Sequence, residues 1–198
     1  MPHPQFIEPC APIVSSRPPS GPEWLHEVKW DGWRCQIIKD REKVSILSRH
    51  RTGWTSRLTK IVEAVRSLPS ESLILDGELL PDRLDFYSLA HAIRRHEVFV
   101  YVFDVLHLDG ESVRHLPLLE RKKLLAQSVP ANPLLLLSEY FDDGDALFEA
   151  CARQKMEGVV SKRKDLPYKS GKCLYWRKSK CSAWREDNKE RYKLFRRR

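Results

Sequence analysis

The chain has 198 residues, 41% hydrophobic and 31% charged, which suits a globular protein large enough for one hydrophobic core. No apolar run approaches the roughly 20 residues of a membrane span, and no basic stretch followed by an apolar segment marks a secretory signal. The five cysteines form no CxxC pair, and the seven histidines form no tight cluster. These counts argue against a zinc site or a disulfide framework and predict a reducing, cytoplasmic location.

The formal net charge of +8 is concentrated at one end of the chain. Residues 172–198 contain eleven Lys and Arg against three acidic residues, whereas the preceding 171 residues carry 24 of each sign. A basic end on an electrically neutral body predicts a polyanionic partner.

The N-terminal half predicts an extended segment followed by strands. Seven prolines in residues 1–22 favour an extended lead-in over a helix. Alternating apolar and polar residues then predict strands joined by short turns, at 24–30, 33–39 and 43–48. Apolar residues at helical spacing predict a helix over 56–67, with Pro69 beyond it as a stop.

The second half alternates between the two kinds of element. The residue patterns predict strands at 72–80, 98–108, 134–141, 157–163 and 173–179, and helices at 85–92, 118–127 and 145–155. No internal repeat or long linker interrupts the series. The fold class predicted is α+β, with antiparallel β-sheets flanked by helices.

The predicted last helix, residues 182–195, has two different stripes. One is mostly apolar and the other is basic with four-residue spacing, the latter consisting of Arg185, Lys189, Lys193 and Arg196. One interpretation is a surface helix that packs on its aromatic side. The other is that the same helix also presents its basic stripe to nucleic acid.

Residues 27–34, Glu-Val-Lys-Trp-Asp-Gly-Trp-Arg, surround Lys29 with groups that can make it a nucleophile toward phosphorus. Partial desolvation or neighbouring cations make a lysine give up its proton more easily, and an arginine such as Arg34 grips phosphate. The alternative interpretation is a strand end and an Asp-Gly turn with ordinary surface charges.

Five further segments follow in an order that resembles one superfamily. They are Ser48-Arg49, Leu75-Asp-Gly-Glu-Leu79, Val102 to Gly110, Glu157-Gly-Val-Val-Ser-Lys162 and Trp176-Arg-Lys-Ser-Lys180. Together with Lys29 to Arg34 they resemble the motifs of the covalent nucleotidyltransferases: ATP-dependent DNA ligases, RNA ligases and mRNA capping enzymes. The pattern is most similar to the ligase domain of bacterial non-homologous end-joining DNA ligases.

The resemblance implies an ATP-grasp-like DNA ligase/mRNA capping nucleotidyltransferase fold and a domain organisation. It places the adenylation domain at 22–180, after a Pro-rich lead-in at 1–21. A basic C-terminal helix and tail at 181–198 follow, without the OB-fold that full ligases carry. Sealing by such a minimal core is expected to need help from another protein.

The resemblance also implies site residues, with ATP as substrate, AMP as the covalent adduct and Mg²⁺ as the metal. Lys29 is the AMP acceptor; Lys178 and Lys180 share one strand face, which the family places against the α-phosphate. Glu78 and Glu157 are the implied metal ligands. The implied nucleotide-binding residues are Glu27, Val28, Arg34, Arg49, Glu78, Phe103, Lys162 and Trp176. One departure concerns Arg49, because Arg51 stands where the family usually has glycine, so we expect a reshaped loop there.

The function predicted is that of an ATP-dependent DNA ligase core in DNA repair. Its predicted partners are DNA with nicks or breaks and a Ku-type end-binding protein or another repair protein, at the nucleoid of a bacterial cytoplasm. An RNA ligase or capping-type nucleotidyltransferase is one alternative. A non-sealing nucleic-acid-binding module that keeps the fold is the other.

Overall fold

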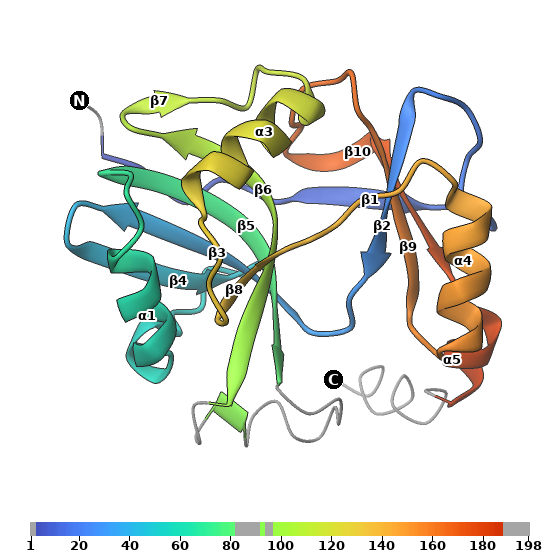
Figure 1. Ribbon diagram of the computed structural model, residues 1–198, viewed down its shortest axis with the longest axis horizontal. Coiled ribbons are helices and arrows are strands. Elements are labelled where there is room, and N and C mark those ends of the chain that lie inside the picture. Colours follow the sequence, from blue (N-terminus) through green and yellow to red (C-terminus); the bar gives the residue numbers. More distant parts are fainter. Residues whose placement is uncertain (1–2, 82–91, 94–96, 188–198) are drawn as a thin grey trace. The chain divides into compact units, whose positions relative to one another are not determined.

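The computed structural model describes residues 3–81, 92–93 and 97–187 (Figure 1). The chain divides into two compact units, each assembled from segments that are far apart in the sequence. Unit 1 comprises Met1–Cys10, Gly32–Ser138 and Asp165–Gly171; unit 2 comprises Ala11–Asp31, Glu139–Lys164 and Lys172–Arg198. Each unit is built on its own β-sheet.

Unit 1 contains a six-stranded sheet whose main path runs β4-β3-β5-β6-β7, with β8 paired to β6. All neighbours are antiparallel except β6 and β8. The strands are β3 (Trp33–Asp40), β4 (Lys43–Ser48), β5 (Ser72–Pro81), β6 (Val98–Leu108), β7 (Glu111–Ser112) and β8 (Leu135–Leu137). Val98, Val100 and Val102 of β6 are buried, whereas the residues between them are half-buried, so one face of the sheet carries the core.

The helical elements whose bounds the structure gives in unit 1 are η1 (Thr55–Arg57), α1 (Thr59–Arg66) and α3 (Leu118–Ser128). On α1, Ile61, Val62 and Val65 are buried in the unit 1 core because they share one face of the helix. α3 begins directly after Pro117, whose fixed φ suits a helix N-terminus, and buries Leu118 and Leu125.

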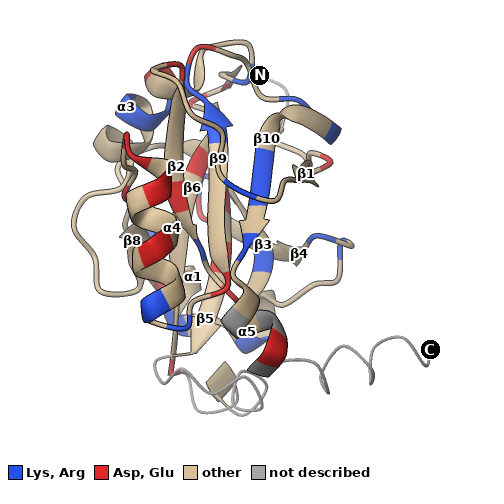
Figure 2. Ribbon diagram, turned by 90° about the vertical axis from the view of Figure 1, so that its right-hand side faces the viewer, with Lys and Arg blue, Asp and Glu red and all other residues tan. Residues whose placement is uncertain are grey.

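Unit 2 contains a four-stranded sheet in the order β1-β10-β9-β2. The strands are β1 (Cys10–Val14), β2 (Trp24–Lys29), β9 (Gly158–Arg163) and β10 (Gly171–Lys180), and the helices are α4 (Gly144–Arg153) and α5 (Ser182–Asp187). Phe148 and Cys151 of α4, Trp184 of α5 and Val159 of β9 form a second hydrophobic cluster. Figure 2 shows acidic residues along α4 and a basic residue in its last turn.

The predicted fold class is confirmed: the structure has mainly antiparallel sheets with few helices. The predicted strands and helices recur with shifted ends, the largest change being β8, which is shorter than the predicted 134–141. β1 and β7 were not predicted. The predicted helix at 85–92 lies almost entirely outside the described residues, as does the last helix beyond Asp187. The predicted domain boundaries stay a prediction.

Within the described ranges, no helix has the length and apolar character needed to cross a membrane.

Candidate active site

In the sheet of unit 2, the neighbouring strands β2, β9 and β10 place two lysines opposite the same glycine. Lys29 of β2 and Lys180 of β10 both lie opposite Gly158, the first residue of β9. Side chains alternate between the two faces of a sheet, so Lys178 shares the face of Lys180, as predicted, and Glu27 shares that of Lys29. Strand pairing thus gathers residues from three separate motifs on one face.

Glu157 lies between the two lysines. Nζ of Lys29 is 2.5 Å from Oε2 of Glu157, and Nζ of Lys180 is 2.6 Å from Oε1. The Glu157 side chain is 4% exposed, whereas the side chains of Lys29 and Lys180 are 22% and 20% exposed. One buried carboxylate therefore holds two ammonium groups, both of which remain accessible from solvent.

Gly158 has to be glycine for this arrangement to form. Its φ of 147° lies in a region that L side chains rarely adopt, and a Cβ atom at this position would be 2.0 Å from the carbonyl oxygen of Ser179. Because it has no side chain, β9 can approach β10 closely beside the carboxylate of Glu157.

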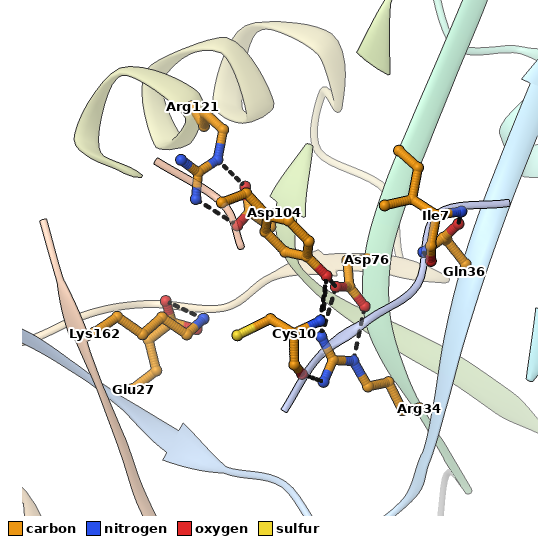
Figure 3. A network of polar contacts seen from close by, with 10 residues as sticks. Ile7, Cys10, Glu27, Arg34, Gln36, Asp76, Asp104, Arg121 and Lys162 are labelled. Carbon is orange, nitrogen blue, oxygen red and sulfur yellow. Dashed lines mark hydrogen bonds and ion pairs between the residues drawn. The ribbon is translucent and has the colours of Figure 1, made fainter. Parts of the chain in front are cut away.

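A second ion pair lies on the same face of this sheet. Nζ of Lys162 is 2.9 Å from Oε1 of Glu27, and both side chains are at most 3% exposed (Figure 3). The same Nζ is 4.2 Å from the centre of the Trp176 ring, which adds a cation–π contact. Burying such a pair is costly, so its retention next to Lys29 favours a binding site over a plain structural core.

The opposite face of the sheet is packed against helices. Val28 packs against the hydrophobic cluster formed by α4, α5 and β9, so only its backbone can contribute to a site on the Lys29 face. His26 is buried on this side, with Nδ1 2.8 Å from Oγ of Ser161. Burial lowers the pKa of His26, although Asp143, Asp142 and Asp145 oppose the shift.

Unit 1 holds the other predicted site residues on β3, β5 and β6. Glu78 is the register partner of Arg34, and its Oε1 accepts a 3.2 Å hydrogen bond from the backbone N–H of Gly32. A Cβ atom on Gly32 would be 2.2 Å from the carbonyl oxygen of Leu79. Gly32 is therefore required for the close approach of these two strands.

Arg34 is held by Asp76. Its Nε and Nη2 donate to Oδ1 and Oδ2 of Asp76 at 3.0 and 2.7 Å, and its Nη1 donates to the carbonyl oxygen of Cys10 (Figure 3). Burial acts to lower the pKa of Arg34, but the charge and hydrogen bonds of Asp76 outweigh it and raise the pKa. The guanidinium carbon lies 5.4 Å from the ring centre of Phe103, which is half-buried.

The loop after β4 presents Arg49 at the surface. Nε of Arg49 donates to Nε2 of His50 at 3.0 Å, and Oγ of Ser48 accepts hydrogen bonds from the backbone N–H groups of His50 and Thr52. Arg51 has a φ of 63°, the conformation that glycine adopts most readily. The arginine that replaces the family glycine therefore takes up a glycine-like conformation, and the Ser48 hydroxyl closes the loop around it.

Residues 12–180 match the family described as the ATP dependent DNA ligase domain. The chain belongs to this family.

Relatives of known name and structure agree with this assignment to the ATP-dependent DNA ligase family. The chain is 32% identical to the multifunctional non-homologous end joining protein LigD of Pseudomonas aeruginosa, over 88% of this chain and 22% of that protein. It is 30% identical to a DNA ligase of Thermococcus fumicolans, over 85% of this chain and 34% of the ligase. The chain thus spans about a third or less of these curated relatives.

Solved structures of this ligase family show the same fold. The ligase domain of Mycobacterium tuberculosis LigD is 26% identical with a TM-score of 0.74, and the match covers 87% of this chain and 60% of that one. The ATP-dependent DNA ligase of bacteriophage T7, solved with ATP, is 16% identical with a TM-score of 0.63, covering 87% of this chain and 68% of that one. At 16% identity, the likeness to the bacteriophage T7 ligase shows a shared fold and nothing about function.

The structure brings the ligase-motif residues together in two groups, one in each unit. The group in unit 2 consists of Glu27, Lys29, Glu157, Lys162, Trp176, Lys178 and Lys180. The group in unit 1 consists of Arg34, Glu78 and Phe103, whereas Arg49 lies on the exposed loop. Sequence reasoning missed Asp76, which stands inside a quoted motif, and Tyr168, for which the sequence offered no signal.

The predicted nucleic-acid-binding stripe stays a prediction. Arg185 belongs to α5, but Lys189, Lys193 and Arg196 lie outside the described residues.

Proposed function

We propose that the chain is the adenylation core of an ATP-dependent DNA ligase. Lys29 attacks the α-phosphorus of ATP, a new N–P bond forms, and the bond to the pyrophosphate oxygen breaks. The 5′-phosphate of a DNA break then attacks the AMP phosphorus and displaces Lys29. The 3′-hydroxyl attacks the activated 5′-phosphorus, AMP leaves, and the new phosphodiester seals the strand. The bridge of Lys29, Glu157 and Lys180 is the single observation that carries the first step.

The bridge supplies what the attack requires of the protein. Lys29 has to lose a proton before it becomes a nucleophile, and Oε2 of Glu157, 2.5 Å from its Nζ, is placed to accept that proton. Lys180 shares the same carboxylate and remains a cation beside the reacting group. Lys178 on the same face adds a second positive charge for the phosphate oxygens.

The base and sugar of the nucleotide need a separate set of contacts. Phe103 provides a half-buried aromatic ring on which adenine can stack, and Glu78 provides a carboxylate for the ribose. Backbone groups at Glu27 and Val28 are proposed to read the base edge. Lys162 and Trp176 lie on the same face of the sheet as Lys29 and are proposed to line the nucleotide site there. Arg49 is proposed to contact the sugar or a DNA phosphate.

We propose Mg²⁺ as the metal of this reaction. Among the described residues no three His, Cys, Asp or Glu side chains gather as a closed metal site would require, and both oxygens of Glu157 already accept lysine ammonium groups. These donors fit an ion held mainly by phosphate oxygens and water, and the candidate protein carboxylates are Glu157 in unit 2 and Glu78 in unit 1. Such an ion, when bound, offsets the negative charge of the phosphates.

The test is to incubate the protein with ATP and Mg²⁺ and to measure its intact mass. We expect the wild type to gain one AMP and Lys29→Ala to gain none, while Glu157→Gln reacts about 100-fold more slowly or worse because the proton acceptor is gone. Lys172→Ala, which removes an exposed lysine of β10, is the matched control and keeps the wild-type rate. An adduct on Lys29→Ala would refute the proposed nucleophile.

Substrate identity is tested in the same reaction. Labelled GTP in place of ATP distinguishes a capping-type enzyme, and nicked RNA in place of nicked DNA distinguishes an RNA ligase. ATP-dependent joining of nicked DNA by the protein is the result that supports the proposal. The name of the P. aeruginosa relative supports a role in end joining, and we propose a Ku-type end-binding protein as the recruiting partner.

A further inference from the structure

The three chain segments of unit 1 meet at Asp76. Arg34 and Asp76 belong to the long middle segment, Cys10 to the first segment and Tyr168 to the last. Oη of Tyr168 donates to Oδ2 of Asp76 at 2.8 Å and accepts a 2.8 Å hydrogen bond from the backbone N–H of Cys10. Asp76 is fully buried and Tyr168 is 7% exposed, so these hydrogen bonds are shielded from water.

The hydroxyl of Tyr168 is suited to this position because it stays protonated. Burial, and after it the charge of Asp76, raises the pKa of Tyr168 well above its ordinary value. The phenol can therefore donate to one group and accept from another at any physiological pH. Nothing in the proposed chemistry uses this hydroxyl.

The orientation of Arg34 depends on the same group. Two parallel hydrogen bonds from Arg34 use both oxygens of Asp76, and Oη of Tyr168 holds that carboxylate from a third direction. Nη1 of Arg34 is fixed in addition by Cys10. The guanidinium plane is thus locked, with its carbon 5.4 Å from the ring centre of Phe103. Its fork is occupied by a carboxylate, which favours a supporting role over that of a phosphate ligand.

The ring of Tyr168 is held independently of its hydroxyl. The backbone N–H of Tyr168 donates to the carbonyl oxygen of Arg114 at 2.9 Å. The guanidinium carbon of Arg121 lies 5.8 Å from the ring centre, and Arg121 is itself fixed by a buried bidentate pair with Asp104 (Figure 3). Removing only the hydroxyl should leave the ring in place.

We propose that Tyr168 is a positioning residue for the aromatic ring of unit 1 that stacks on adenine. Tyr168 locks Arg34 through Asp76 and by accepting a 3.4 Å hydrogen bond from Nη2 of Arg34, and Arg34 in turn holds the ring of Phe103, on which the base stacks. This inference rests on the proposed function, and it assigns Tyr168 and Asp76 to the affinity for the base and not to the chemistry at Lys29.

The test compares Tyr168→Phe with the wild type in ATP-dependent AMP transfer to Lys29. We expect the KM for ATP to rise about 3- to 10-fold with kcat within about 2-fold, because the 2.8 Å hydrogen bond to Asp76 and the weaker 3.4 Å one from Nη2 of Arg34 are lost while the lysine site is untouched. Tyr175→Phe, in β10 of unit 2, is the matched control and keeps the wild-type KM.

A double-mutant cycle separates positioning from a general loss of stability. If Tyr168 acts through Phe103, adding Tyr168→Phe to Phe103→Leu changes the KM no further. Independent effects that multiply, or a fall in kcat at unchanged KM, would overturn the inference. So would an effect of Tyr168→Phe confined to the step that uses DNA, since that would place Arg34 on the 5′-phosphate.

A second measurement does not depend on activity. Hydrogen exchange of the Arg34 Nε–H, followed by NMR, should be at least about 10-fold faster in Tyr168→Phe, because the carboxylate that protects it is no longer fixed. Unchanged exchange would overturn the inference even if AMP transfer is observed. Absence of an AMP adduct on the wild type, in contrast, would reject the proposed function while this measurement still reports on Tyr168.

Discussion

Single backbone positions determine how closely the charged groups of the site can approach one another. Gly158 allows β9 to run beside Ser179 where a side chain would collide with the carbonyl oxygen. Gly32 does the same for β3 beside Leu79 in unit 1. Arg51 shows the opposite case, since a non-glycine residue has a φ of 63° and is stabilised by neighbouring hydrogen bonds instead.

Substitution of Gly158 by alanine is expected to destabilise unit 2. The new Cβ atom meets Ser179 at 2.0 Å and the backbone has to leave its favoured conformation, which together cost about 3 kcal/mol or more. Urea unfolding of the purified variant measures this free energy. Gly53→Ala is the control, because no atom lies within 4 Å of its new Cβ; equal stability of the two variants would contradict the prediction.

At the scale of elements, strand register and helix capping place the site. Lys29, Glu157 and Lys180 are separated by up to 151 positions in the numbering, yet antiparallel pairing of β2, β9 and β10 sets them side by side. α4 covers the opposite face of this sheet. Its N-terminus is capped by Asp143, whose Oδ1 accepts a 2.9 Å hydrogen bond from the backbone N–H of Ala146.

Loss of this cap should weaken the packing behind the Lys29 face. Asp143→Ala is expected to lower the free energy of unfolding by about 1 kcal/mol, because one N–H at the start of α4 loses its partner. Thermal unfolding followed by circular dichroism measures the change. Asp142→Ala removes an adjacent exposed acid without a capping bond and should stay within about 0.5 kcal/mol of the wild type.

At the scale of the whole molecule, the described part of each unit contains a buried histidine whose neutral form is favoured. Burial lowers the pKa of His26 in unit 2 and of His107 in unit 1 below the ordinary value of 6.5, in each case against the pull of nearby acids. The unfolded chain therefore binds protons at a higher pH than the folded chain does. The contribution of the two neutral histidines to the free energy of unfolding is fully present above pH 6.5 and decreases as the pH falls below that value.

The stability of the protein should therefore decrease between pH 7.5 and pH 5.5. The urea midpoint at these pH values measures the decrease, and His26→Gln and His107→Gln should each show a smaller pH dependence than the wild type. His115→Gln removes an exposed histidine and should leave the slope unchanged. A wild-type midpoint that is constant over this range would contradict the prediction.

The sequence by itself determined most of the elements, the fold class and the family. Alternation of apolar residues sufficed for β2 to β4, and the ordered motifs pointed to Lys29, Glu157 and Lys180, because residue type and local spacing are visible along the chain. Two short strands were not predicted: β1 pairs with β10, which is distant in sequence, and β7 is only two residues long, at the end of a tight hairpin with β6.

Only the tertiary structure decided which groups contact one another. That Glu157 bridges Lys29 and Lys180, that Lys162 is buried against Glu27, and that Asp76 occupies the fork of Arg34 all depend on strand register. Tyr168 had no recognisable signal, because its hydroxyl contacts Asp76, 92 positions earlier in the chain, and Cys10, 158 positions earlier. Such contacts are set by folding of the whole chain and not by any local pattern.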